Sequence, residues 1–464
     1  MNDRLKGFYN YLEGRRIAVL GIGMSNTPLV KMFLSKAGHV IACDRRSRDQ
    51  LGSIAEELEK AGAELRLGDG YLNDLNVDII FRTPGMKYNL PQLEKARRQG
   101  IVVTSEMEVF FDLCPGRILA VTGSDGKTTT TTLIAKMLQK QGYTIHVGGN
   151  IGHPLLPEIE TVKPDDMAVV ELSSFQLISM RKSPDIAVVT NVTPNHLDIH
   201  KDMEEYISAK RNVLLHQNAF SRTVLNLDNK TTAAMAEQTR GQCLMFSRRA
   251  KVEYGSYLSD NGDILMADTA GTHKVINQAD IMIPGLHNVE NYLAAIAATW
   301  GLVTPETVRD VARSFAGVEH RIEFVREIGG AKYYNDSIAT SPTRTIAGLN
   351  SFREKVILIA GGYDKHIPFT ALGPKVTEKV KYLILLGKTA DKIEEAVRSA
   401  PDYSAETLPI IRVESLEQAV SAARNYARAG DIVTLSPACA SFDMFKNFEQ
   451  RGDAYKEIVN SLPA

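Results

Sequence analysis

A tight glycine-containing loop between a strand and a helix constrains this 464-residue chain more than any other feature. The apolar run "RILAVTG" has the pattern of a buried strand, and "KTTTTTLIAKMLQK" has that of a helix with one apolar face. Only Ser124 and Asp125 separate Gly123 from Gly126, whereas the usual phosphate loop places four residues between its glycines. A helix start favours an anion through its free N–H groups and its dipole, so this context predicts a site for the phosphates of ATP.

Lys127 and Thr128 begin the helix and are candidates for contact with the nucleotide. We expect the lysine to neutralise β- and γ-phosphate oxygens and the Thr128 hydroxyl to bind Mg²⁺. The alternative is an ordinary strand-to-helix turn that carries an exposed lysine.

Alternation of short β-branched runs with amphipathic stretches predicts an α/β protein of three domains, over residues 1–113, 114–317 and 318–464. The first and last are expected to be Rossmann-like parallel sheets. The middle domain is expected to be a P-loop ATPase-type sheet that is mostly parallel. Within it, "YLSDNGDILMA" predicts a hairpin around Asn261-Gly262, and hence appended antiparallel strands.

Composition argues against several classes of partner. The net charge is −1, so no global field attracts nucleic acid or a membrane surface. The four cysteines form no C-x-x-C pair, which argues against a disulfide framework or zinc site and fits a reducing cytoplasm. No apolar run has the length of a membrane span. We expect a cytoplasmic monomer that binds neither nucleic acid nor membrane.

Polar residues at strand ends mark a second part of the predicted ATP site. Glu171 ends the strand "DMAVVEL", and His196 follows "DIAVVTNV". Ligands gather at the carboxyl ends of parallel strands, so both are candidate metal ligands, although either can be an ordinary loop residue. Lys210 lies on the apolar stripe of the next helix, seven residues after Met203. It either extends to the surface or reaches the metal site, where it has to be neutral or converted to an anion.

The first domain allows a rival interpretation. Gly21 and Gly23 follow a strand, and Asp44 ends the next strand, as in an NAD-binding fold. However, Asn26 occupies the place of the third glycine, which weakens the prediction of a dinucleotide site.

Ten motifs together identify a family resemblance: "GSDGKTT", "GGNIG", "ELSSFQL", "NVTPNHLDIH", "YISAKRN", "GLHNVEN", "EHRIE", "NDSIATSP", "GGYDK" and "SPACASFDMFKNFEQRG". As an ordered set they span all three segments and resemble the Mur ligase superfamily, most closely its D-glutamate-adding branch. The resemblance implies ATP-dependent amide formation between D-glutamate and UDP-N-acetylmuramoyl-L-alanine in cytoplasmic peptidoglycan precursor synthesis. It further implies an acyl phosphate, then a tetrahedral intermediate. Such chemistry needs positioning and charge neutralisation more than an enzyme nucleophile.

The resemblance also assigns roles by position. It implies two Mg²⁺ sites and a carbamate formed from CO₂ on Lys210. The implied catalytic residues are Lys127, Glu171, His196 and Lys210, and the implied metal ligands are Thr128, Glu171, His196 and carbamylated Lys210. The implied ATP contacts are Gly123, Ser124, Asp125, Gly126, Lys127, Thr128, Thr129, Asn288, Asn291, Arg321 and Asp336. The implied contacts of the UDP-substrate are Gly23, Met24, Ser25, Arg45, Arg46, Thr83, Gly85, Asn150, Ser173 and His196. The implied D-glutamate contacts are Thr340, Lys365, Ser441 and Phe448.

Two positions depart from the family pattern. Ile338 stands where many members have lysine, and Arg45 stands where some have a small hydroxyl residue. Without the resemblance, Ser441 is a helix cap and Phe448 a core aromatic. The competing functions are another Mur-type or a folylpolyglutamate-type ligase, a nucleotide-binding regulatory module without turnover, and an NAD-dependent oxidoreductase.

Overall fold

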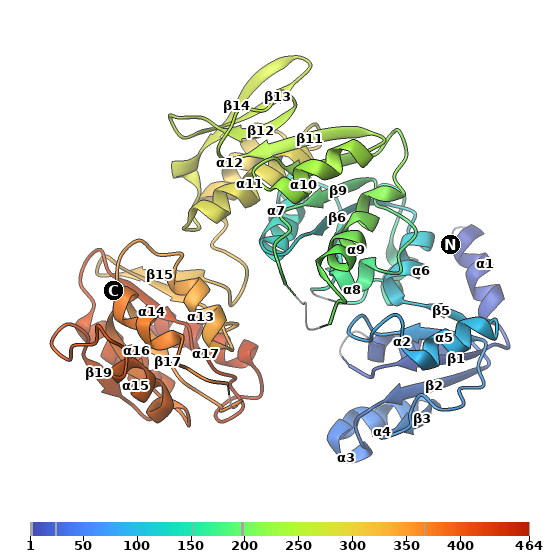
Figure 1. The fold of residues 1–464 in the computed structure, drawn as a ribbon, viewed down its shortest axis with the longest axis horizontal. Coiled ribbons are helices and arrows are strands. Elements are labelled where there is room, and N and C mark those ends of the chain that lie inside the picture. The colour runs from blue at the N-terminus through green and yellow to red at the C-terminus, as the bar shows by residue number, and fades with distance from the viewer. Residues whose placement is uncertain (1–2, 24–25, 152, 196–198, 366, 464) are drawn as a thin grey trace. The chain divides into compact units, whose positions relative to one another are not determined.

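The computed structural model describes residues 3–23, 26–151, 153–195, 199–365 and 367–463 (Figure 1). Two compact units are present. The first comprises Met1–Asp280 and Val289–Val311, and the second Ile281–Asn288 and Ala312–Ala464. The described residues hold three sheets, two in the first unit and one in the second. The domain boundaries expected near residues 113 and 317 stay predictions.

The first sheet is entirely parallel, in the order β3-β2-β1-β4-β5. Its central strands are buried on both faces, which explains their continuous apolar sequence. The strands are β1 (Arg16–Leu20), β2 (His39–Asp44), β3 (Glu64–Leu67), β4 (Ile79–Arg82) and β5 (Val102–Thr104). The helices are α1 (Asp3–Leu12), α2 (Asn26–Leu34), α3 (Arg48–Leu51), α4 (Ser53–Lys60), α5 (Pro91–Arg98) and α6 (Glu106–Leu113).

The second sheet has nine strands in the order β14-β13-β12-β11-β10-β9-β6-β8-β7. Strands β6 to β12 pair in parallel with one another, whereas β13 pairs antiparallel with both β12 and β14. The strands are β6 (Arg117–Thr122), β7 (Ile145–Gly149), β8 (Met167–Glu171), β9 (Ile186–Val189), β10 (Arg222–Asn226), β11 (Gln242–Ser247), β12 (Gly255–Leu258), β13 (Asp263–Asp268) and β14 (Gly271–Asn277). The predicted hairpin is confirmed as β12–β13, and its Gly262 has a φ of 83°, which favours glycine.

Short and long helices accompany this sheet. They are α7 (Lys127–Gln141), α8 (Ser174–Leu177), α9 (Met203–Leu215), α10 (Lys230–Ala234), α11 (Leu286–Thr299) and α12 (Pro305–Ser314). The 3₁₀ segments are η1 (Leu156–Thr161), η2 (Met235–Gln238) and η3 (Gln278–Asp280). None of the helices in the described part of the chain combines the length and apolarity needed to span a membrane.

The third sheet has the order β15-β16-β20-β17-β18-β19, and only β15 is antiparallel to its neighbour. The strands are β15 (Glu323–Ile328), β16 (Ala331–Asn335), β17 (Val356–Ala360), β18 (Val380–Leu385), β19 (Ile410–Arg412) and β20 (Ile432–Leu435). The helices are α13 (Pro342–Leu349), α14 (Leu372–Lys379), α15 (Ala390–Arg398), α16 (Leu416–Tyr426) and α17 (Phe448–Ser461). The α/β class with appended antiparallel strands is therefore confirmed. Strand β15 was not anticipated, because an edge strand with charged residues lacks a buried apolar run.

Candidate functional site

The loop between β6 and α7 can be built only with glycine at both of its ends. Gly123 and Gly126 have φ angles of 150° and 77°, a region that side chains disfavour. A Cβ atom on Gly123 would lie 1.9 Å from Thr190 Oγ1, and one on Gly126 would lie 2.4 Å from Asn291 Oδ1. The loop therefore packs closely against Thr190 and Asn291. Helix α7 begins directly after it, at Lys127.

Residues that follow β9 fix the conformation of this loop. Thr190 Oγ1 donates to the Asp125 carbonyl at 2.6 Å, and Asn191 Oδ1 accepts from the Asp125 amide at 2.9 Å. The Ser124 hydroxyl is 2.9 Å from the Thr193 carbonyl and 3.0 Å from the Tyr206 hydroxyl. The carboxyl edge of the sheet thus holds the loop in a preformed state, in which the orientation of its backbone is determined before any ligand binds.

Glu171 lies at the end of β8, beside the phosphate loop, and is 1% exposed. Its Oε2 accepts from Thr128 Oγ1 at 2.7 Å, and its Oε1 accepts from Asn150 Nδ2 at 2.7 Å. Lys127 Nζ donates to the Ser124 carbonyl at 2.9 Å. The buried Glu171 carboxylate and the half-buried Thr128 hydroxyl are hard oxygen ligands of the kind that Mg²⁺ prefers, so their chemistry fits a magnesium ion.

Lys210 points from α9 into the same cluster. Its Nζ donates to the Gly123 carbonyl at 2.7 Å and lies 4.7 Å from the centroid of the Tyr206 ring. The side chain is 1% exposed, so it does not extend to the surface. Burial lowers the pKa of Lys210 to about 7, and the nearby charge of Lys127 acts in the same direction. A large fraction of this amine is therefore neutral near neutral pH.

Asn291 in α11 completes the surroundings of the loop, because its Oδ1 accepts from Thr130 Oγ1 at 3.2 Å. Asn288, in the same helix, donates to the Pro284 carbonyl at 2.6 Å. Both amides are buried. Thr129, the third residue of α7, is buried as well.

Three of the expected contacts, Met24, Ser25 and His196, lie outside the described residues. The second histidine of the motif "NVTPNHLDIH" is His200, which was not singled out from the sequence. His200 is buried, 2.9 Å from Ser174 Oγ and 3.1 Å from Glu205 Oε2. It stacks on Phe175 with the ring centroids 5.1 Å apart. Its signal in the sequence was its position just before α9.

Asp44 and Arg46 close the glycine loop that follows β1. Asp44 Oδ2 accepts from the Ile22 amide at 2.7 Å, and Arg46 Nη2 donates to the same oxygen at 2.9 Å. Burial disfavours the ionised form of Asp44, but the hydrogen bonds from Arg46 and Ile22 outweigh it and lower the pKa of the carboxyl group. An NAD-binding fold uses a carboxylate at this position to bind the ribose. In this protein the Asp44 carboxylate is instead bonded to the Ile22 amide and to Arg46.

The remaining expected contacts of the UDP-substrate have mixed surroundings. Thr83 packs against Gly21, where an added Cβ would lie 2.8 Å from Thr83 Cγ2. Arg45 and Gly85 are exposed, and Gly23 is half-buried. The Ser173 hydroxyl caps α8 and donates to Gln176 Oε1 at 2.8 Å. This capping partner gives Ser173 a structural role.

In the second unit, Asp336 is a buried acid among the expected site residues. Ser436 Oγ donates to its Oδ2 at 2.7 Å. Burial raises the pKa of Asp336 to about 7, although the Ser436 hydrogen bond and the charge of Arg321 oppose this. Asp336 is therefore balanced between its neutral and ionised forms near pH 7.

Lys365 and Thr340 lie together, because Lys365 Nζ donates to the Thr340 carbonyl at 3.4 Å. Ser441 is buried, and its Oγ has no hydrogen-bond partner among the described residues. Phe448 begins α17 and meets His320 edge-on, with the ring centroids 5.9 Å apart. Arg451, not anticipated from the sequence, is buried and donates to the carbonyls of Ser337, Cys439 and Ala440 at 2.9 to 3.2 Å. It organises the turn that presents Ser441.

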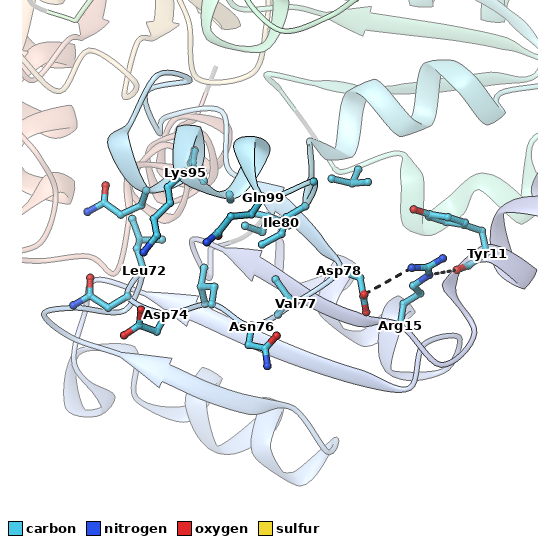
Figure 2. A pocket seen from close by; sticks show the side chains of 18 residues that line it. Tyr11, Arg15, Leu72, Asp74, Asn76, Val77, Asp78, Ile80, Lys95 and Gln99 are labelled. Carbon is cyan, nitrogen blue, oxygen red and sulfur yellow. Dashed lines mark hydrogen bonds and ion pairs between the residues drawn. The ribbon is translucent and has the colours of Figure 1, made fainter.

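A separate hollow lies in the first unit (Figure 2), and its volume is about 750 Å³. Its lining includes Arg15, Asp78, Lys95 and Gln99, and the Arg15–Asp78 ion pair spans 3.7 Å. Arg15 and Asp78 directly precede β1 and β4, so the hollow lies at the amino ends of those strands. Binding sites in parallel sheets form at the opposite, carboxyl ends, and we do not place the candidate site in this hollow.

Comparisons with known proteins match Mur ligases along the whole chain. Residues 121–299 match the family described as Mur ligase middle domain, and residues 320–439 match the one described as Mur ligase, glutamate ligase domain. A protein of Acetivibrio thermocellus named UDP-N-acetylmuramoylalanine–D-glutamate ligase is 54% identical, and one of Clostridium kluyveri with the same name is 51% identical. Each alignment covers 100% of both chains.

Solved structures show the same fold at low sequence identity. The UDP-N-acetylmuramate-alanine ligase of Thermotoga maritima is 17% identical, with a TM-score of 0.57 and coverage of 96% of this chain and 99% of that chain. A UDP-N-acetylmuramoyl-L-alanyl-D-glutamate–2,6-diaminopimelate ligase is 19% identical, with a TM-score of 0.54 and coverage of 92% and 87%. These similarities support the three-sheet α/β architecture.

Proposed function

The chain belongs to the Mur ligase family, and from that membership we propose that it joins D-glutamate to UDP-N-acetylmuramoyl-L-alanine at the expense of ATP. Two relatives that carry this activity in their names align with the chain from end to end at 54% and 51% identity. The structural observation that carries the proposal is the cluster of buried Glu171, buried Lys210 and half-buried Thr128 around the phosphate loop. The product is a precursor of peptidoglycan.

The proposed reaction uses the γ-phosphate of ATP to activate the substrate carboxylate. A carboxylate oxygen forms a bond to phosphorus as the bond to ADP breaks, which gives an acyl phosphate. The D-glutamate nitrogen then attacks the carbonyl carbon and loses a proton, and the tetrahedral intermediate releases inorganic phosphate to leave an amide. The backbone amides at the start of α7 bind the phosphates, and Lys127 balances the negative charge that develops on the leaving ADP.

Magnesium is proposed at Thr128 and Glu171, because their side-chain oxygens lie 2.7 Å apart and the Glu171 carboxylate is buried. When bound, the ion supplies positive charge to the phosphoryl oxygens. A second ion would involve His196 and a carbamate on Lys210. The support for the carbamate is the buried, partly neutral amine, since only an uncharged amine reacts with CO₂ and the resulting anion offers oxygen ligands. Carbamate formation releases one proton.

The amino acid substrate is proposed to bind in the second unit. Lys365, which donates a hydrogen bond to the Thr340 carbonyl, offers its charge to a carboxylate of D-glutamate. The Ser441 hydroxyl, which has no partner among the described residues, offers a hydrogen bond. Phe448 would supply an apolar wall. Ile338 contributes no charge here, so Lys365 carries the electrostatic recognition. A monomeric, cytoplasmic enzyme stays a prediction.

The test is ADP release measured with each substrate omitted in turn. We expect release to require both UDP-N-acetylmuramoyl-L-alanine and D-glutamate, with L-glutamate ineffective. Transfer of ¹⁸O from the substrate carboxylate into phosphate would establish the acyl phosphate. Equal rates with L-glutamate, or with D-glutamate omitted, would reject the proposal. Thermal stabilisation by a folate but not by UDP would instead favour a folylpolyglutamate-type ligase.

A further inference from the structure

Arg82 is a buried cation at the carboxyl edge of the first sheet. It is the last residue of β4 and is 2% exposed. Burying a charge is costly unless hydrogen bonds compensate it, so a side chain in this position requires an explanation from its contacts. Arg82 directly precedes the turn of Thr83 to Gly85, which is expected to contact the UDP-substrate.

The guanidinium group joins two segments that are far apart in sequence. Nη2 donates to Ser179 Oγ at 2.7 Å and to the Phe175 carbonyl at 3.1 Å. Nη1 donates to the Met86 carbonyl at 3.4 Å. Phe175 belongs to α8 beside the second sheet, whereas Met86 follows the turn after β4. One planar group therefore holds the turn and α8 at a fixed separation.

A hydroxyl relay connects the arginine to a carboxylate. Ser179 Oγ accepts from Arg82 and donates to Glu108 Oε2 at 3.0 Å. Ser105 Oγ donates to the same Glu108 oxygen at 2.7 Å. The positive charge is thus balanced through Ser179 by an acid in α6. The geometry has both the hydrogen bonds and the charge compensation that a rigid buried junction needs.

The two segments also form the walls of a hollow of about 150 Å³. Met86 and Tyr88 line it from the segment after the turn, and Phe175 of α8 and Ile178, the residue after α8, line it from the other side. Tyr88 packs against two arginines, with its ring centroid 5.5 Å from Arg82 Cζ and 4.3 Å from Arg97 Cζ. Arg82 fixes the distance between the segment around Met86 and helix α8, and this distance is also the width of the hollow.

We infer that Arg82 is a positioning residue that holds the Thr83–Gly85 turn against α8 and thereby shapes the site of the UDP-substrate. The inference rests on the proposed function, because the turn and Ser173 at the start of α8 are both assigned to that substrate. Arg82 has no role in the phosphate loop or in the Thr128–Glu171 pair. Its loss should weaken nucleotide-substrate binding and leave the ATP site unchanged.

The experiment compares Arg82→Met and Ser179→Ala with the control Arg98→Met, in which an arginine of α5 with an 83% exposed side chain is changed. For Arg82→Met we expect the KM for UDP-N-acetylmuramoyl-L-alanine to rise about 10- to 30-fold, as expected when buried polar groups lose their partners. Ser179→Ala should raise it about 3- to 10-fold by the same reasoning. The KM values for ATP and D-glutamate and the kcat should stay near wild type, and Arg98→Met should change nothing.

Direct calorimetry with UDP separates this inference from the proposed function. Wild-type protein that binds UDP but makes no amide would reject the function, whereas an active wild type accompanied by variants with unchanged UDP-substrate KM would reject the role of Arg82. An equal rise of all three KM values would also reject it, since that result indicates general loss of structure. If Arg82→Met fails to fold, Ser179→Ala provides the same test.

Discussion

Lys210 Nζ lies 2.7 Å from the carbonyl oxygen of Gly123, the first glycine of the phosphate loop. This contact joins α9 to the loop across 87 positions of sequence. It places a buried amine next to the start of α7, so that the amine and the loop form one structural group.

Lys210→Ala should remove nearly all ligase activity, because the proposed carbamate can no longer form. The fold should be retained, because only one side chain is shortened. A small carboxylate such as acetate should restore part of the activity by returning an anionic oxygen to the space. ADP release and a circular dichroism spectrum provide the measurements. Lys136→Ala, an exposed position on α7, is the control. A fully active Lys210→Ala enzyme would contradict the proposed role.

The stability of the protein should depend on pH through Lys210. Its pKa is lowered from 10.5 to about 7 in the folded chain. Below pH 7 both states hold the proton, whereas between pH 7 and 10.5 only the unfolded chain holds it, so stability rises with pH across this window. The slope is at most about 1.4 kcal/mol per pH unit. Denaturant titrations of wild type and Lys210→Met in CO₂-free buffer measure it as their difference, and parallel curves would contradict it.

Thr128→Val should raise the Mg²⁺ concentration needed for half-maximal activity, because a proposed metal ligand is lost. It should also lower kcat about 10- to 100-fold, because a buried Glu171 oxygen is left without its donor. Thr128→Ser keeps the hydroxyl and should stay within about threefold of wild type. Activity measured against Mg²⁺ concentration tests the pair. Similar metal titration curves for the valine and serine variants would exclude the hydroxyl as a ligand.

Gly123→Ala should abolish ATP binding, because its Cβ would lie 1.9 Å from Thr190 Oγ1 at a φ that side chains disfavour. Gly7→Ala is the matched control, since nothing lies within 4 Å of its added Cβ. Fluorescence titration with a labelled ATP analogue gives the affinity. Normal binding by Gly123→Ala would show that the loop can change its conformation.

Lys365→Ala should raise the KM for D-glutamate about 10- to 100-fold through loss of a charge-assisted hydrogen bond. The KM for ATP should be unchanged, because ATP contacts are assigned to other residues. Lys355→Ala removes an exposed lysine of the same unit and should behave like wild type. An unaltered D-glutamate KM would remove Lys365 from the proposed pocket.

The sequence predicts the structure best where a short motif directly follows a buried apolar strand. The β6–loop–α7 unit follows from two glycines and an apolar run, and the parallel strands follow from their continuous apolar character. The position of Lys210 on an apolar stripe also indicated an unusual environment.

Contacts between distant segments could not be read in this way. Arg82 appears in the sequence only as the end of a strand, and its role depends on Phe175 and Ser179, more than 90 residues away. His200 and Arg451 likewise acquire their partners only when separate elements pack. Strand β15 is defined by its pairing with β16 and not by its own composition.

The two donors on Glu171 have a consequence for how a cation enters. Each carboxylate oxygen already accepts one hydrogen bond, from Thr128 or from Asn150, and these two bonds restrict rotation about the terminal side-chain torsion. The entropy of immobilising this ligand is therefore lost during folding and not during metal capture. A cation that binds here coordinates carboxylate oxygens whose orientation is already fixed. The site therefore selects among cations by coordination geometry as well as by charge.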